Sequence, residues 1–176
     1  KSFDSLITTE TPQDIAGVAK IPLWTANDLI SKPTIVILDG VQDLGNVGAI
    51  FRLCLGFNAS LLLVESADPT SPKVIRSSVG ALFSAPWIEM TRDDTESWIQ
   101  NQNRPIFRLE IPKKNSSSTN YKLSSTPAII IAGSEGHGIT LFVKGESVSI
   151  PHESSLESLN VTHALAIVLF EKYRTN

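Results

Sequence analysis

Three short segments in the second half of the chain carry residue types suited to binding a flat ligand. Residues 133–138 read Gly-Ser-Glu-Gly-His-Gly, residues 149–151 read Ser-Ile-Pro, and residues 158–161 read Ser-Leu-Asn-Val. Glycine lets the main chain approach a ligand closely, proline stiffens a turn, and a Ser/Asn pair suits a helix start. The segments therefore predict a cleft of main-chain N–H and C=O groups, which suits a ligand such as adenine with its ribose.

A second polar turn follows an apolar run earlier in the chain. Residues 34–39 read Thr-Ile-Val-Ile-Leu-Asp, as expected of a parallel strand that is covered on both faces. The turn 40–45 then leads to Asn46, which we predict to be the N-cap of a helix over 47–57. Ligands of parallel α/β sheets bind at the carboxyl ends of strands, so the turns 39–46 and 133–138 are expected to face one crevice.

The remaining sequence alternates strand and helix patterns. The predicted strands are 15–19, 34–39, 60–64, 86–90, 105–110, 128–132 and 148–150, and the predicted helices are 25–30, 47–57, 72–77, 93–102 and 158–173. This alternation predicts an α/β fold with a mostly parallel sheet and helices on both faces. The polar residues 1–14 are interpreted as a connector from a preceding domain, residues 15–176 as one domain, and residues 113–120 as a surface loop.

Composition restricts the function classes. The 176 residues include 41% hydrophobic and 19% charged residues, which is ordinary for a globular domain. The apolar runs fall short of the roughly 20 residues of a membrane span, and the first residues lack a signal-peptide pattern. A single cysteine, Cys54, fits a reducing compartment, so we expect a cytoplasmic protein without a membrane partner. The net charge of −3 argues against nucleic-acid binding through bulk positive charge.

Three separated motifs together resemble those of the SpoU (TrmH-like) branch of the SPOUT RNA methyltransferases. They are residues 39–52 (DGVQDLGNVGAIFR), residues 131–138 (IAGSEGHG), and the Ile-Pro and Ser-Leu-Asn-Val pieces of residues 150–161. Residues 76–81 resemble a further family segment, and the resemblance covers about residues 33–173. One departure is Asp43-Leu44, where the family usually has Asp-Pro.

The resemblance implies a C-terminal deep trefoil knot, bound S-adenosylmethionine and a homodimer. It also implies methyl transfer to a ribose 2′-hydroxyl, with ribosomal RNA as the expected substrate and transfer RNA as the alternative. An N-terminal RNA-binding domain would precede the connector. Two other readings stay open: a non-catalytic protein that binds the cofactor and RNA, and an unrelated α/β enzyme that binds ATP or NAD. The G-x-G-x-x-G, P-loop and G-x-S-x-G motifs are absent from the sequence.

The motif match also implies roles for individual residues. The cofactor would be bound by Ala132, Gly133, Gly136, Ile150, Pro151, Ser158, Leu159 and Asn160. Catalytic roles would fall to Arg52, Asn46, Glu135, Asn160 and Ser158. A general base must lose its proton, and removing the proton of an arginine near neutral pH costs roughly 9 kcal/mol. A phosphate clamp keeps the guanidinium cationic and avoids this cost, so it is the less demanding role for Arg52. Both roles stay open. The three histidines show no metal-ligand spacing, and no metal site is expected.

Overall fold

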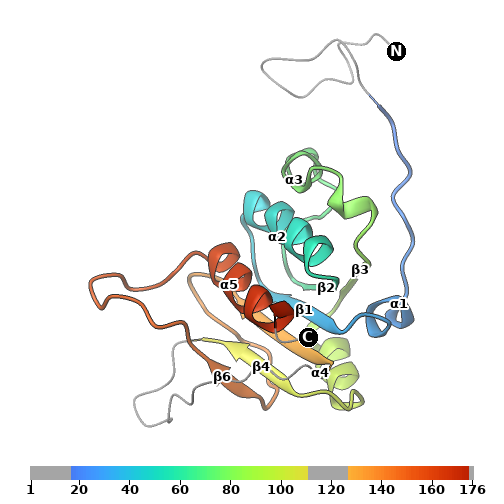
Figure 1. Ribbon diagram of the computed structural model, residues 1–176. Helices are drawn as coiled ribbons and strands as arrows, with labels where there is room; N and C mark the ends of the chain where they lie inside the picture. Colours follow the sequence, from blue (N-terminus) through green and yellow to red (C-terminus); the bar gives the residue numbers. More distant parts are fainter. Residues whose placement is uncertain (1–16, 111–126, 175–176) are drawn as a thin grey trace.

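The computed structural model describes residues 17–110 and 127–174, which form a six-stranded sheet with helices on both faces (Figure 1). The strand order is β3-β2-β1-β5-β4-β6, and every strand pair is parallel. The strands are β1 (Thr34–Asp39), β2 (Ala59–Val64), β3 (Trp87–Met90), β4 (Ile106–Leu109), β5 (Ala128–Gly133) and β6 (Glu146–Val148). The predicted α/β fold with a parallel sheet is thus confirmed.

The centre of the sheet explains the uninterrupted apolar runs of the sequence. All six residues of β1 and of β2 are buried, because helices cover both faces of the sheet. β1 lies between β2 and β5, and its last residue, Asp39, pairs in register with Val64 and Gly133. The turn after β1 and the glycine-rich turn after β5 therefore start side by side, as expected from the sequence.

Two hydrophobic clusters attach the helices to the sheet. On one face, α2 (Leu44–Gly56), α3 (Pro72–Ser78) and α5 (Val161–Arg174) pack on alternate strand residues such as Val36 and Leu38. On the other face, α1 (Ala26–Ile30) and α4 (Arg92–Gln100) pack on Ile35 and Ile37. A 3-10 turn, η2 (Ala81–Phe83), joins α3 to β3. The alternation of side chains along each central strand thus supplies both layers of the core.

Two helix starts differ from the sequence-based predictions. α2 begins at Leu44, and its N-cap is Asp43, whose carboxylate accepts a hydrogen bond from the Asn46 backbone N–H at 2.7 Å. The prediction of Asn46 as N-cap was wrong, and the Asn46 side chain is left for other contacts. α5 begins at Val161 instead of Ser158, because Asn160 Oδ1 accepts from the Thr162 backbone N–H at 2.9 Å and starts the helix there.

The strand predictions need two corrections. β6 covers Glu146–Val148 instead of 148–150, which leaves Ser149 and Ile150 in the loop that follows. Residues 17–19 of the predicted strand 15–19 have no regular structure. The other predicted strands and the predicted helices 25–30, 72–77 and 93–102 agree to within two residues. The predicted connector 1–14 and loop 113–120 lie outside the described residues. None of the helices described combines the length and apolar character needed to span a bilayer.

Candidate functional site

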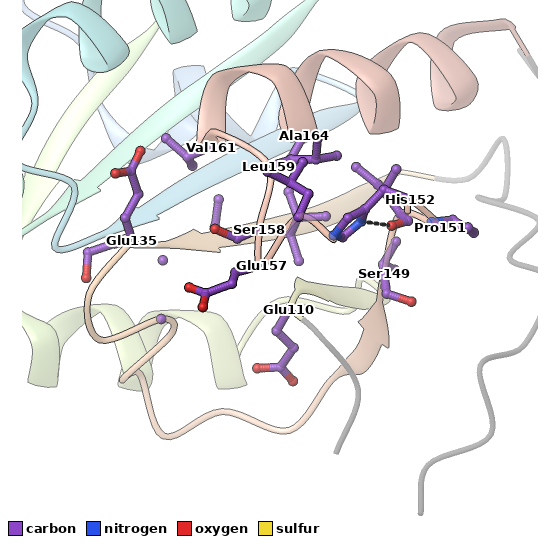
Figure 2. A pocket seen from close by; sticks show the side chains of 18 residues that line it. Glu110, Glu135, Ser149, Pro151, His152, Glu157, Ser158, Leu159, Val161 and Ala164 are labelled. Carbon is purple, nitrogen blue, oxygen red and sulfur yellow. Dashed lines mark hydrogen bonds between the residues drawn. The ribbon is translucent and has the colours of Figure 1, made fainter. Parts of the chain in front are cut away.

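A cavity of about 580 Å³ opens where β4, β5 and β6 end (Figure 2). Its walls are Leu109 and Glu110, the segment 132–135 with Gly138, the segments 148–152 and 156–159, and Val161 and Ala164. These walls include parts of all three segments in which the sequence predicted a main-chain cleft. The volume falls within the range of small-molecule sites, which suits an adenosine-sized ligand.

Gly133 allows the glycine-rich turn to close on itself. A Cβ atom at this position would lie 2.1 Å from the carbonyl carbon and oxygen of Gly138 and 2.4 Å from the Ile139 nitrogen. All three are backbone atoms, so any side chain here would force the turn open. Gly138 has a φ of +65°, a conformation that glycine adopts without strain. The shape of this cavity wall therefore requires glycine at both positions.

The buried carboxylate of Asp39 anchors the exit of the same turn. Its side chain is 0% exposed, and Oδ2 accepts hydrogen bonds from the backbone N–H groups of Thr140 at 2.5 Å and Leu141 at 2.7 Å. The Thr140 hydroxyl lies 3.1 Å from Oδ1 and donates to this carboxylate as well. On the entry side, the Ser134 backbone N–H donates to the Asp39 carbonyl oxygen at 3.1 Å. A single residue at the end of β1 thus holds both ends of the glycine-rich turn.

Arg92, at the start of α4, joins this anchor to a third strand end. Its Nη1 lies 3.0 Å from Asp39 Oδ1 in an ion pair, at an angle outside hydrogen-bond geometry, and Nη2 donates to Glu65 Oε2 at 2.6 Å. The hydrogen bond to Glu65 raises the pKa of Arg92. Sequence reasoning missed Arg92 and Glu65 because only the fold brings them to Asp39.

A polar cluster joins three of the residues that the motif match had singled out. Asn160 Nδ2 donates to Asn46 Oδ1 at 3.1 Å and lies 3.3 Å from Glu135 Oε1. The Thr162 hydroxyl donates to Asn46 Oδ1 at 3.2 Å. The cluster therefore connects the first turn of α2, the glycine-rich turn and the start of α5.

The other predicted residues divide into two groups. Ala132, Gly133, Ile150, Pro151, Ser158 and Leu159 line the 580 Å³ cavity, whereas Gly136 and Asn160 do not. Arg52 is exposed on α2 and does not line the 580 Å³ cavity or the smaller cavity described below. It stands six residues beyond Asn46, which is about 9 Å along the helix axis.

The charges around the cavity have one sign. Glu110, Glu135 and Glu157 line it, and among the described residues no lysine or arginine does so (Figure 2). Glu110 is ion-paired with Arg108 at 3.1 Å and accepts from the Ser147 hydroxyl at 2.7 Å, so its position is fixed and its charge is offset, which leaves Glu135 and Glu157 as the main acidic groups. His152 is the remaining titratable lining residue, and its Nδ1 lies 2.8 Å from the Ile150 carbonyl oxygen. An acidic lining of this kind favours a cationic ligand over a neutral or anionic one.

A second cavity, of about 280 Å³, adjoins the first. It is lined by 40–43 from the turn after β1, by 134–137 from the glycine-rich turn, and by Val161. Ser134, Glu135 and Val161 line both cavities, so the two cavities adjoin at these residues. The two polar turns do share one crevice, as the sequence predicted. In the part of the chain that is described, no three His, Cys, Asp or Glu side chains are grouped as metal ligands would be.

Comparison with known proteins identifies one family. Residues 33–170 match the model of the SpoU rRNA Methylase family. The chain is 32% identical over 170 residues to a 23S rRNA (adenosine(1067)-2′-O)-methyltransferase of Streptomyces azureus, an alignment that covers 91% of this chain and 62% of that protein. It is 28% identical over 174 residues to the 23S rRNA (guanosine(2553)-2′-O)-methyltransferase RlmP of Bacillus subtilis, covering 96% and 68%.

A solved structure shows the same arrangement of elements. The AdoMet-bound rRNA methyltransferase from Sinorhizobium meliloti superposes with a TM-score of 0.73 at 28% identity. The match covers 80% of this chain and 56% of that one. The chain thus spans between about half and two thirds of the length of these relatives.

Proposed function

Because this chain belongs to the SpoU rRNA Methylase family, we propose that it transfers a methyl group from S-adenosylmethionine to a ribose 2′-hydroxyl of RNA. Ribosomal RNA is the main substrate class, since the relatives from Streptomyces azureus and Bacillus subtilis are named as 23S rRNA methyltransferases. The observation that carries the proposal is the meeting of the second and third motifs around one cavity with acidic walls, with residues 40–43 of the first motif lining the cavity that adjoins it.

The 580 Å³ cavity fits S-adenosylmethionine in shape and in charge. The close approach of Gly133 and Gly138 leaves main chain against the ligand, and Ala132, Gly133, Ile150, Pro151, Ser158 and Leu159 would hold its adenosine part. S-adenosylmethionine supplies an activated methyl group on a positively charged sulfur. Glu135 and Glu157 favour that positive charge, whereas Arg108 offsets the charge of Glu110. The acidic lining offers nothing comparable to the phosphates of ATP or NAD.

The polar cluster is the part of the site suited to the acceptor. A ribose hydroxyl is a weak nucleophile until its proton is taken, and it must be held in line with the bond that breaks. Glu135 lines both cavities, and Asn160 holds it beside Asn46. In this proposal Glu135, Asn46 and Asn160 orient the hydroxyl, and Glu135 is placed to accept its proton.

Arg52 acts on the RNA backbone. Its guanidinium is exposed on α2, where a phosphate can reach it from solvent or from a second subunit. A planar guanidinium binds phosphate in two-point fashion, which would fix the nucleotide next to the target ribose. This role needs a cation, which an exposed arginine supplies.

We extend the proposal to assembly. The exposed face of α5 carries Ile167, Phe170 and Tyr173, which are 43%, 52% and 55% exposed, and such a stripe suits a homodimer interface. β6 pairs with β4 at the edge of the sheet, whereas α5 returns to the layer of α2, a path compatible with a C-terminal trefoil knot. The buried, single Cys54 supports a reducing location such as the cytoplasm, and an N-terminal RNA-binding domain remains part of the proposal.

Two measurements test the function. Calorimetry with S-adenosylhomocysteine, the product of the cofactor, should show binding, whereas ATP and NAD should show none. Transfer of labelled methyl to ribosomal RNA transcribed in vitro should be seen, and transfer RNA serves as the competing substrate. Cofactor binding without transfer to either RNA would leave only the non-catalytic reading. Mapping 2′-O-methyl groups in cells with and without the gene then identifies the nucleotide.

A further inference from the structure

We propose that the 280 Å³ cavity is the acceptor subsite, which takes one ribonucleoside turned out of its RNA stack, with the His137 ring stacked on the base. The inference rests on the proposed function and adds to it the place and the contacts of the target nucleoside. His137 then holds the base and Gln42 reads its edge, and neither is among the predicted catalytic or cofactor-binding residues.

The position of the cavity is the first argument. It shares Ser134, Glu135 and Val161 with the larger cavity, so the two cavities adjoin at these residues and ligands in them would lie next to each other. Transfer of a methyl group requires the donor and the acceptor to lie next to each other. Asn160 ties Glu135 to Asn46 in this region, which places the polar cluster beside the junction.

The size and the chemistry of the walls are the second argument. The cavity has about half the volume of its neighbour, which suits a nucleoside better than a second cofactor. Gln42 and Asp43 are exposed, and both are held in place. Gln42 Nε2 donates to the Glu65 carbonyl oxygen at 2.5 Å, and Asp43 Oδ1 accepts from the Asn46 N–H at 2.7 Å. The Gln42 amide retains its oxygen and a second N–H, the groups that read a base edge.

His137 supplies the third argument. Its backbone N–H donates to the Ser134 hydroxyl at 3.2 Å, which fixes the residue in the turn. The ring itself makes no hydrogen bond or ring contact with the residues that the structure describes, although it lines the cavity and is exposed. Sequence-specific RNA proteins stack unpaired bases on aromatic side chains, histidine included. No lysine or arginine of the described chain lines this cavity, so it suits a base with its sugar and leaves phosphate to Arg52.

The experiment compares His137→Ala, His137→Phe and Gln42→Ala with the wild-type protein. Methyl transfer is measured on unmodified 23S rRNA and transfer RNA transcripts, and cofactor affinity by calorimetry with S-adenosylhomocysteine. His137→Ala should lower kcat/KM for the RNA about tenfold, which is the value of one base stack, with unchanged cofactor affinity. His137→Phe keeps an aromatic ring and should recover most of that loss. Gln42→Ala should also lower kcat/KM.

Gln100→Ala, an exposed glutamine on α4 that lines neither cavity, is the matched control and should behave as the wild type. Wild-type kcat/KM in both His137→Ala and Gln42→Ala would overturn the subsite while leaving the proposed function intact. A loss of cofactor affinity in His137→Ala, or no rescue by His137→Phe, would also overturn it. Absence of methyl transfer by the wild-type protein to either RNA would instead overturn the proposed function, and the subsite with it.

Discussion

Substituting Asp39 should release the glycine-rich turn and lower both stability and cofactor affinity. In Asp39→Ala the backbone N–H groups of Thr140 and Leu141 lose their common acceptor, and Arg92 loses one of its two carboxylate partners. Leu141 is 2% exposed, so its N–H cannot turn to water without opening the loop.

The magnitude follows from the number and kind of these contacts. A hydrogen bond to a charged group contributes about 1.5 to 3 kcal/mol. Three are lost here, and water can replace only the one from the hydroxyl of the exposed Thr140, so the two backbone N–H groups set the cost. The Arg92 side chain is 26% exposed and keeps Glu65, so the broken ion pair adds less than a fully buried pair would. We expect Asp39→Ala to lower the free energy of unfolding by about 3 to 5 kcal/mol. Asp39→Asn can keep a neutral acceptor for both N–H groups and should lose about 2 kcal/mol.

Urea unfolding measures the stability, and calorimetry with S-adenosylhomocysteine measures the binding. Asp68→Asn is the control, because this exposed carboxylate accepts hydrogen bonds only within the local turn. The Thr70 backbone N–H donates to Asp68 Oδ1 at 2.8 Å. The Asp68→Asn variant should change stability by less than about 0.5 kcal/mol. If Asp39→Ala lowered the free energy of unfolding by less than about 1 kcal/mol and bound S-adenosylhomocysteine as the wild type does, Asp39 would not be the anchor of the cavity wall.

Three further predictions concern other parts of the molecule. Gly133→Ala should abolish S-adenosylhomocysteine binding in calorimetry, because the new Cβ would lie 2.1 Å from backbone atoms of Gly138. Gly136→Ala is the control and should retain binding, because no atom lies within 4 Å of a Cβ at that position. Arg52→Ala should abolish methyl transfer and leave cofactor affinity unchanged. Arg52→Lys should recover little of the activity, because lysine cannot bind a phosphate at two points as a guanidinium does. Normal turnover in Arg52→Ala would remove this residue from the mechanism. Burial, with Arg104 nearby, lowers the pKa of Lys172, which is 1% exposed. The unfolded chain therefore binds more protons between that lowered pKa and the ordinary value of 10.5, and stability should rise with pH there in urea unfolding. Lys172→Met should flatten this rise, and an unchanged slope would contradict the assignment.

The sheet could be predicted from the sequence because its signals are local. Residues 34–39 and 128–132 are continuous apolar runs bounded by turn residues, and both are central strands, as β1 and β5 show. The start of α2 was predicted three residues too late, because Asn46 is a good N-cap residue type and so is Asp43, three residues earlier. The earlier start prevails because Asp43 accepts the Asn46 N–H and Leu44 packs against the core.

The contacts within the site could not be predicted from local pattern. Asp39 reaches Thr140 across 101 residues, and Asn46 reaches Asn160 across 114. No periodicity encodes such a pairing, since it depends on which strands become neighbours. The motif resemblance did place Asn46, Glu135 and Asn160 in one site, whereas Arg92 and Glu65 lie outside the motifs and became visible only through the fold.

The distribution of charge separates the two ligands of the proposed reaction. The larger cavity carries glutamates and no described lysine or arginine, so it favours a sulfonium cation and disfavours phosphate. Arg52 stands outside both cavities and in solvent, where its charge is available to an RNA backbone. The arrangement therefore favours the phosphate clamp for Arg52 and leaves proton acceptance to Glu135, the carboxylate that lines both cavities.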